Sequence, residues 1–231
     1  MLTLDKLILT FPDFSLSADI KVPAGGITAV IGPSGGGKST LLSAIAGFVQ
    51  PTSGRIDCDG LDITGKSPAD RPVSLLFQDN NLFPHLTVAQ NVLLGMRPSL
   101  RMQKGDADRI AAVLGKVGLA GYETRKPSAL SGGQQSRAAL ARVLLGGRPV
   151  VLLDEPFAAL GPALRDEMLD LCAEILAIQG RTVLMVTHDP RDAARVAGQT
   201  IVVMDGVVGP PVKTGPLLAD PPAALRAYLG D

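Results

Sequence analysis

A segment near the N-terminus has the residue types and spacing of a phosphate-binding loop. It fulfils the pattern G-x-x-x-x-G-K-[ST] and consists of Gly32, Pro33, Ser34, Gly35, Gly36, Gly37, Lys38, Ser39 and Thr40. Glycines let the backbone turn tightly and direct its N–H groups toward phosphate oxygens. We expect Lys38 to reach the β- and γ-phosphates and the Ser39 hydroxyl to take a Mg²⁺ position. The loop therefore predicts a nucleotide-binding site.

The flanks of this loop have the pattern that such a site requires. Residues 26–31 form a short apolar run of strand character, and residues 41–46 open a helical pattern. The positive end of that helix would face the phosphates. This context favours a phosphate loop over a flexible glycine-rich turn.

Two carboxylates follow a second apolar run, Val150 to Leu153. In a phosphate-loop protein, Asp154 would orient Mg²⁺ and Glu155 would polarise the attacking water. The alternative is a strand that ends in a solvated acidic turn. The upstream phosphate loop favours the catalytic interpretation.

Composition limits the function classes. The chain has 231 residues, is 46% hydrophobic and carries 22 Lys+Arg against 22 Asp+Glu without a basic block, which argues against nucleic acid as the main partner. Its two cysteines lie in no CxxC motif, which argues against a disulfide framework or a zinc site and fits a reducing compartment. No signal peptide and no bilayer-long apolar stretch are found. We expect a protein that is soluble by itself and that docks on a spanning partner if it acts at a membrane.

The order of the apolar runs predicts an α/β fold. Short runs at 73–77, 150–153, 182–186 and 200–204 read as buried strands of a mostly parallel sheet, with helical patterns such as 162–178 between them. Residues 4–9 and 14–20 alternate between apolar and polar, which predicts an N-terminal antiparallel β subdomain. Residues 87–145 contain helical stretches without a convincing strand and predict an inserted helical subdomain, and 222–229 predict a short terminal helix.

A second motif, Leu130 to Gln134, narrows the function. Ser131 is a plausible N-cap, with Gly132, Gly133 and Gln134 behind it and a helical run over 136–145, so the motif predicts a second anion-binding helix N-terminus. Its residues read LSGGQ, and at this point the chain resembles the ATP-binding cassette ATPases of ABC transporters, whose signature motif this is. The resemblance covers essentially the whole chain, and it implies one ABC ATPase domain over 1–231 with a RecA-like core.

The resemblance also implies roles for residues that the motifs alone leave open. Gln78 corresponds to the glutamine that contacts Mg²⁺ and senses the transmembrane partner, although a polar residue ending a strand is the simpler alternative. His188 corresponds to the histidine that contacts the γ-phosphate, against a structural role. Phe11 is the expected adenine-stacking aromatic, with Phe14 as its rival, and either residue could belong to the core. Cassettes of this family pair head to tail, so each ATP would lie between the phosphate loop of one copy and Ser131 of the other.

Two departures from the family pattern stand out. The segment after Glu155 reads Ala158-Ala159-Leu160-Gly161, so the aspartate that usually contacts the partner subunit is replaced by Gly161. Ser136 stands where the family usually has a glutamine after the signature.

The chain resembles the importer branch of the family, and the doubled asparagine within 78–92 is most similar to the ATPases of thiamine importers. The implied partners are a second copy, a transmembrane permease and, indirectly, a periplasmic or extracellular solute-binding protein, with the chain at the cytoplasmic face of the inner membrane. Importers of another small solute (iron, a polyamine or molybdate) remain open. So do a soluble cassette ATPase acting on nucleic acid or ribosomes and a phosphate-loop kinase, although the balanced charge disfavours the former and the signature motif the latter.

Overall fold

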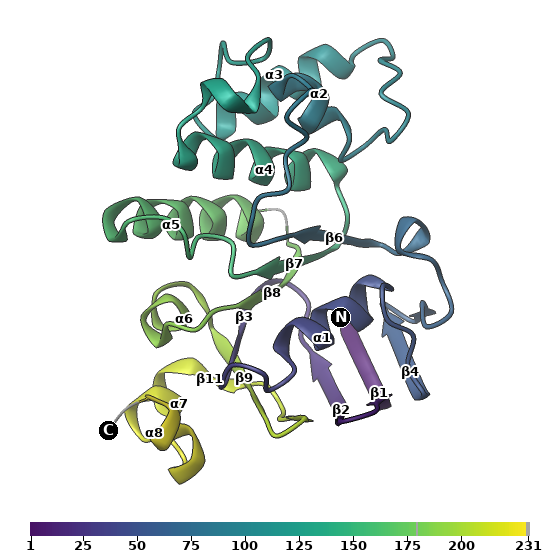
Figure 1. Ribbon diagram of the computed structural model, residues 1–231, viewed down its shortest axis with the longest axis vertical. Coiled ribbons are helices and arrows are strands. Elements are labelled where there is room, and N and C mark those ends of the chain that lie inside the picture. Colours follow the sequence, from purple (N-terminus) through teal and green to yellow (C-terminus); the bar gives the residue numbers. More distant parts are fainter. Residues whose placement is uncertain (179, 230–231) are drawn as a thin grey trace.

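The computed structural model describes residues 1–178 and 180–229, and a mixed sheet of eleven strands runs through this part of the chain (Figure 1). The strand order is β5-β4-β1-β2-β10-β9-β3-β8-β7-β6, and β11 pairs with β9. The sheet thus joins an antiparallel part to a parallel part, and the strands of the two parts interleave in the sequence.

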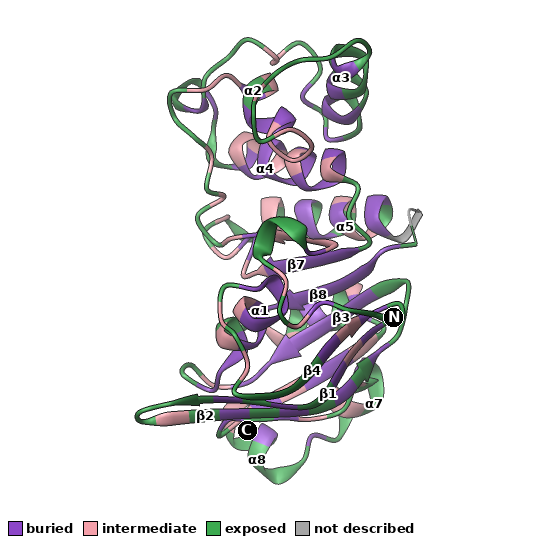
Figure 2. Ribbon diagram, turned by 90° about the vertical axis from the view of Figure 1, so that its right-hand side faces the viewer, coloured by how far each residue is buried: buried purple, intermediate pink, exposed green. Residues whose placement is uncertain are grey.

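The parallel part consists of the apolar runs that the sequence indicated. Its strands, in spatial order, are β9 (Gln199–Met204), β3 (Gly26–Ile31), β8 (Thr182–Val186), β7 (Val150–Asp154) and β6 (Val73–Leu76). Strands β7 and β8 are buried along nearly their whole length, as expected for strands covered on both faces (Figure 2). Successive side chains point to opposite faces, so Val151 and Leu153 enter one core while Val150 and Leu152 enter the other.

The antiparallel part contains β1 (Leu2–Phe11), β2 (Phe14–Val22), β4 (Ser53–Cys58) and β5 (Leu61–Asp62). The alternation in the sequence correctly predicted β1 and β2, whose buried and exposed residues alternate. It missed β4 and β5, because β4 contains few apolar residues and its placement depends on pairing with β1. Two further short strands, β10 (Val207–Val208) and β11 (Val212–Lys213), were also not anticipated.

Helices cover both faces of the sheet. Helix α1 (Lys38–Ala46) shares one core with β1 and β2, whereas α5 (Pro162–Ile178) packs into the other. Three short helices follow: α6 (Pro190–Val196), α7 (Thr214–Ala219) and α8 (Ala223–Leu229). The sequence indicated α5 and α8 but not α7.

Between β6 and β7 the chain forms helices: α2 (Val88–Leu93), α3 (Asp106–Lys116) and α4 (Gly132–Gly146). They lie together at one end of the molecule, with the parallel strands between them and the antiparallel strands (Figure 1). Single 3₁₀ turns stand at Pro68–Asp70 and Pro127–Ala129. Helix α4 begins directly after Ser131, which confirms the predicted N-cap, and it includes the predicted helical run over 136–145. No helix within the described residues is long and apolar enough to cross a membrane.

Candidate functional site

The carboxyl ends of the parallel strands bring most of the candidate residues to one edge of the sheet. The phosphate loop follows β3, Asp154 ends β7, and His188 comes two residues after β8. Open α/β sheets bind their ligands at this edge, because the loops that leave parallel strands converge there.

The phosphate loop joins β3 directly to α1. Gly32 has φ 146°, and a Cβ at this position would stand 2.0 Å from the Val203 carbonyl oxygen. Only glycine fits here, because the loop backbone runs against β9. The loop therefore has a fixed path, and its last residues start the helix whose N-terminus faces an incoming anion.

Lys38 is held inside the loop. Its Nζ donates to the carbonyl oxygens of Gly32 at 2.8 Å and Pro33 at 2.9 Å. Burial lowers the pKa of Lys38, while the charges of Glu155 and Asp154 oppose this shift. The two carbonyl oxygens thus hold the ammonium group at the loop, where the phosphates of a nucleotide would add negative charge.

Ser39 and Asp154 face each other across the sheet edge. The Ser39 hydroxyl donates to Asp154 Oδ1 at 3.3 Å. Burial raises the pKa of Asp154, the bond from Ser39 lowers it, and the neighbouring charge of Glu155 raises it further. A hydroxyl and a carboxylate are ligands that Mg²⁺ prefers, and within the described residues no three His, Cys, Asp or Glu side chains cluster to hold a metal alone. This donor set fits an ion that takes its remaining ligands from phosphate and water.

Glu155 and His188 meet beside the loop. His188 Nδ1 lies 3.1 Å from Glu155 Oε2, and the His188 side chain is 54% exposed. Glu155 has φ 45°, a conformation that costs a non-glycine residue about 1–3 kcal/mol. Its backbone N–H donates to the Val186 carbonyl at 3.1 Å, which holds this strained residue against β8. A carboxylate and an imidazole at the mouth of the phosphate loop can activate water and contact a terminal phosphate.

A cavity of about 230 Å³ adjoins the loop. It is lined by Phe14, Ser34, Gly35, Gly37, Lys38, Ser39, Thr40 and Glu155. The lining includes Phe14 and not Phe11, which is the reverse of the order of preference predicted from sequence. The two rings are 6.2 Å apart across the hairpin of β1 and β2, and Phe11 is exposed. The hairpin register therefore favours Phe14 as the aromatic nearest to a bound base.

The signature residues form the start of α4. Ser131 Oγ accepts from the Gln134 backbone N–H at 3.3 Å, and Gln134 Oε1 accepts from the Ser131 N–H at 3.0 Å, which makes a reciprocal capping box. A Cβ on buried Gly133 would lie 2.6 Å from Leu164, so glycine permits close packing of α4 on α5. Ser131 and Gly132 are exposed, and neither lines the cavity at the phosphate loop. Within one chain the two anion sites are separate.

Gln78 lies two residues after β6, is exposed, and does not line the described cavity. The loop after it is fixed by a residue that the sequence did not indicate: Arg142 of α4 donates to the carbonyl oxygens of Asn81 at 2.7 Å and Asn80 at 2.9 Å. Both asparagines have positive φ, at 60° and 43°. Asparagine tolerates this conformation, which explains the doubled asparagine.

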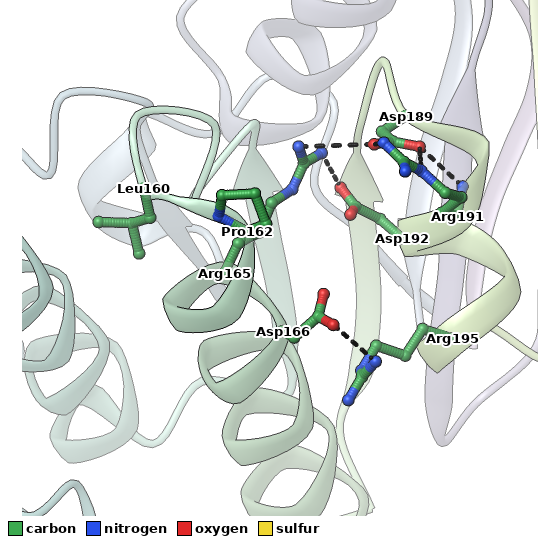
Figure 3. Close-up of a pocket in the computed structure, with 8 residues that line it drawn as sticks. All are labelled: Leu160, Pro162, Arg165, Asp166, Asp189, Arg191, Asp192 and Arg195. Atoms are coloured by element: carbon green, nitrogen blue, oxygen red, sulfur yellow. Dashed lines mark hydrogen bonds and ion pairs between the residues drawn. The ribbon is translucent and has the colours of Figure 1, made fainter.

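A second group that sequence reasoning missed surrounds the backbone of His188. Thr187 Oγ1 donates to Asp192 Oδ2 at 2.6 Å, and Arg165 of α5 forms ion pairs with Asp192 and Asp189. These charged side chains line a cavity of about 310 Å³ between α5 and α6, with Leu160 and Pro162 at its edge (Figure 3). In the sequence, this group could have been predicted only from the position of Arg165, which lies one helical turn after Gly161. The Tyr228 hydroxyl of α8 donates to the His188 carbonyl oxygen at 3.2 Å.

Comparison with known proteins identifies the family to which this arrangement corresponds. Residues 16–158 match the family described as ABC transporter. The chain is 61% identical over 230 residues to the thiamine import ATP-binding protein ThiQ of Cereibacter sphaeroides, and 54% identical to that of Ruegeria sp., with 100% of both chains covered in each case.

Solved structures agree in fold. The chain is similar to the ADP conformation of MJ1267, an ATP-binding cassette of an ABC transporter, with a TM-score of 0.86 and 25% identity over 100% of this chain and 99% of that one. It is also similar to the cassette in the dimeric structure of MJ0796, with a TM-score of 0.77 and 28% identity over 93% and 99% of the two chains. The predicted cassette fold and the resemblance from which it came are confirmed.

Proposed function

Because this chain belongs to the ABC transporter family and is an ATP-binding ATPase, we propose that it is the motor subunit of an importer that carries thiamine or a thiamine phosphate. The observation that carries this proposal is the full-length identity of 61% and 54% to two proteins named as thiamine import ATP-binding proteins. We treat residues 1–231 as one ABC ATPase domain with a helical subdomain at about 87–145.

The geometry supports a division of labour among the residues of the site. Residues 32–40 would bind the phosphates, with the Lys38 ammonium among them. Glu155 would act as the general base that accepts a proton from the attacking water. His188, whose Nδ1 lies 3.1 Å from Glu155 Oε2, would contact the terminal phosphate. Phe14, with Phe11 beside it, would stack on the adenine. Ser39, Asp154 and Gln78 would hold Mg²⁺, which would neutralise phosphate charge.

A second copy of the chain would complete the site. The exposed N-terminus of α4 carries Ser131, Gly132, Gly133 and Gln134, a helix start of the kind that binds anions. The cavity at the phosphate loop is open on one side and lacks these residues. Head-to-tail pairing would bring the two together over ATP, and the solved relative MJ0796 is described as dimeric.

Permease subunits would dock near the Gln78 loop. Two aromatic pairs lie in the sequence on either side of Gln78: Phe48 with Phe77, whose ring centroids are 6.3 Å apart, and Phe83 with His85, at 6.0 Å. Phe48 is 58% exposed and Phe83 42% exposed, which is unusual for phenylalanine. Docking here would place the chain at the cytoplasmic face of the inner membrane, with a solute-binding protein engaged indirectly across the membrane.

The decisive experiment combines purification and transport. The membrane complex that contains the chain is purified from its native cells, and the co-purified permease and binding protein are identified by mass spectrometry. Uptake of labelled thiamine is then compared with uptake of iron, a polyamine and molybdate. We expect ATP-dependent thiamine uptake that Lys38→Ala abolishes. Uptake of another solute instead would refute the assignment of thiamine as substrate. A complex without a permease would refute the assignment of the chain to an importer.

The catalytic assignment is tested separately. Glu155→Gln should bind ATP, lose turnover and elute as an ATP-dependent dimer in size-exclusion chromatography, since the amide still forms hydrogen bonds but cannot accept the proton. Lys38→Ala is the matched control that should remain monomeric with ATP. A Glu155→Gln protein that hydrolyses ATP normally would contradict the role of this carboxylate.

A further inference from the structure

The backbone around His188 is held by residues of several helices. Asp189 caps α6, and its N–H donates to Thr187 Oγ1 at 3.1 Å. Arg165 of α5 joins this group through its ion pairs with Asp189 and Asp192. A further contact, to the His188 carbonyl oxygen, comes from α8.

The contact from α8 is a single directed hydrogen bond. The Tyr228 hydroxyl donates to the His188 carbonyl oxygen at 3.2 Å across 40 residues of sequence. Helix α8 is anchored by Leu225, which is 1% exposed and belongs to the same core as α5 and β8. Tyr228 is partly buried against this core, so its ring has a defined position from which to hold the carbonyl.

Charge at this place favours the hydroxyl as a donor. Burial raises the pKa of Tyr228, and the charges of Glu155 and Asp189 raise it further. The phenol therefore keeps its proton at neutral pH and donates to the carbonyl.

We propose that Tyr228 is a positioning residue for ATP hydrolysis, because its hydroxyl fixes the peptide after His188 and thereby aims the imidazole at Glu155. The imidazole is more than half exposed, and Glu155 is its hydrogen-bonding partner among the described residues. Its direction thus depends on the backbone of residues 187–189, which the hydrogen bonds of Thr187 and Tyr228 hold. This inference rests on the role proposed above for His188.

The test removes only the hydroxyl. In Tyr228→Phe, kcat for ATP hydrolysis by the full chain should fall about threefold to tenfold, the change that follows from loss of one neutral hydrogen bond. ATP affinity should stay unchanged and the melting temperature should fall by at most about 5 °C, because one hydrogen bond is lost from the fold while the ring still fills its place. Arg226→Gln is the matched control on α8, since it breaks an exposed ion pair with Asp220 and should leave kcat unchanged.

Two further readouts separate positioning from mere stability. Tyr228→Phe should have no additional effect in a His188→Ala background, because the proposed action passes through the imidazole. The chain has only two histidines, so their ring signals can be followed by NMR. We expect the His188 ring signals to shift in Tyr228→Phe and those of His85 to remain.

The outcomes are distinguishable. Unchanged kcat with unmoved His188 signals would overturn the inference, and so would an equal kcat loss in Arg226→Gln. A fully active His188→Ala variant would refute the proposed role of His188, and with it the catalytic consequence of the contact. A His188→Ala variant with reduced but measurable turnover, in which Tyr228→Phe lowers kcat by the same factor as in the native chain, would overturn the positioning alone.

Discussion

Arg71 is the largest side chain that the fold buries completely, and removing it should show what fixes the phosphate-loop helix. Its exposed fraction is 0%. The guanidinium donates to the carbonyl oxygens of Ala44 at 2.7 Å and Ile45 at 2.9 Å, at the end of α1, and to those of Thr64 at 2.6 Å and Lys66 at 3.0 Å. The residue caps the C-terminus of the helix that begins with Lys38, where a cation is also favoured by the helix dipole.

The expected loss follows from these four bonds. At the low end of about 1.5 kcal/mol for a hydrogen bond to a charged group, they contribute about 6 kcal/mol. Removing the cation also relieves its desolvation, which returns roughly 2 to 3 kcal/mol of this sum. We therefore expect Arg71→Met to lower the free energy of unfolding by about 3 to 4 kcal/mol, because methionine leaves buried carbonyl groups without donors.

Urea unfolding of the nucleotide-free chain measures this loss. The midpoint should fall by about 1 M or more. Arg71→Lys keeps the charge but lacks the planar fork of donors, so it should lose about half as much. Arg148 is the control, because its exposed side chain makes one hydrogen bond among the described residues, at 3.4 Å to the Ala69 carbonyl. Arg148→Met should change stability by less than about 0.5 kcal/mol. A loss below about 1 kcal/mol for Arg71→Met would refute the capping argument.

Three other substitutions test the site. Burial raises the pKa of Asp154 above its usual 3.8, so protonation of this carboxyl stabilises the fold; the contribution is complete below pH 3.8 and is lost as pH rises through the folded-state pKa. Asp154→Asn should therefore melt at a higher temperature than the native chain near pH 7, with the difference disappearing below pH 3.8, and it should lose ATP turnover. A lower melting temperature near pH 7 would contradict this sign. A Cβ at Gly161 meets nothing within 4 Å, so Gly161→Asp should change monomer stability by only about 0.3 kcal/mol. It should raise ATP-driven dimerisation and the ATPase rate in the presence of the permease. Equal rates for both forms would show that backbone contacts already hold the dimer without this carboxylate. Ser131→Arg should block hydrolysis without weakening ATP binding to the monomer, and equal losses in a titration and a rate assay would argue against pairing across two copies.

Much of the site was predictable because its motifs are local. The phosphate loop, the Asp154–Glu155 pair and the signature each need a short run of specific residues beside one strand or helix. The parallel strands were predictable for the same reason, since each is a continuous apolar run. The start of α4 was predictable too, because its N-cap, Ser131, belongs to the signature motif itself. Strands β4 and β5 were missed because they exist through pairing, β4 with β1 and β5 with β4, rather than through their own pattern.

By itself, the sequence determined the chemical groups and the elements that carry them. Only the tertiary structure decided which groups meet. Ser39 reaches Asp154 across 115 residues and His188 reaches Glu155 across 33, because the order of parallel strands brings their carboxyl ends together. The hairpin register places Phe14 rather than Phe11 at the cavity, and the docking of α8 brings Tyr228 to His188. These contacts depend on strand order, register and core packing, which join distant segments and leave no pattern within any one of them.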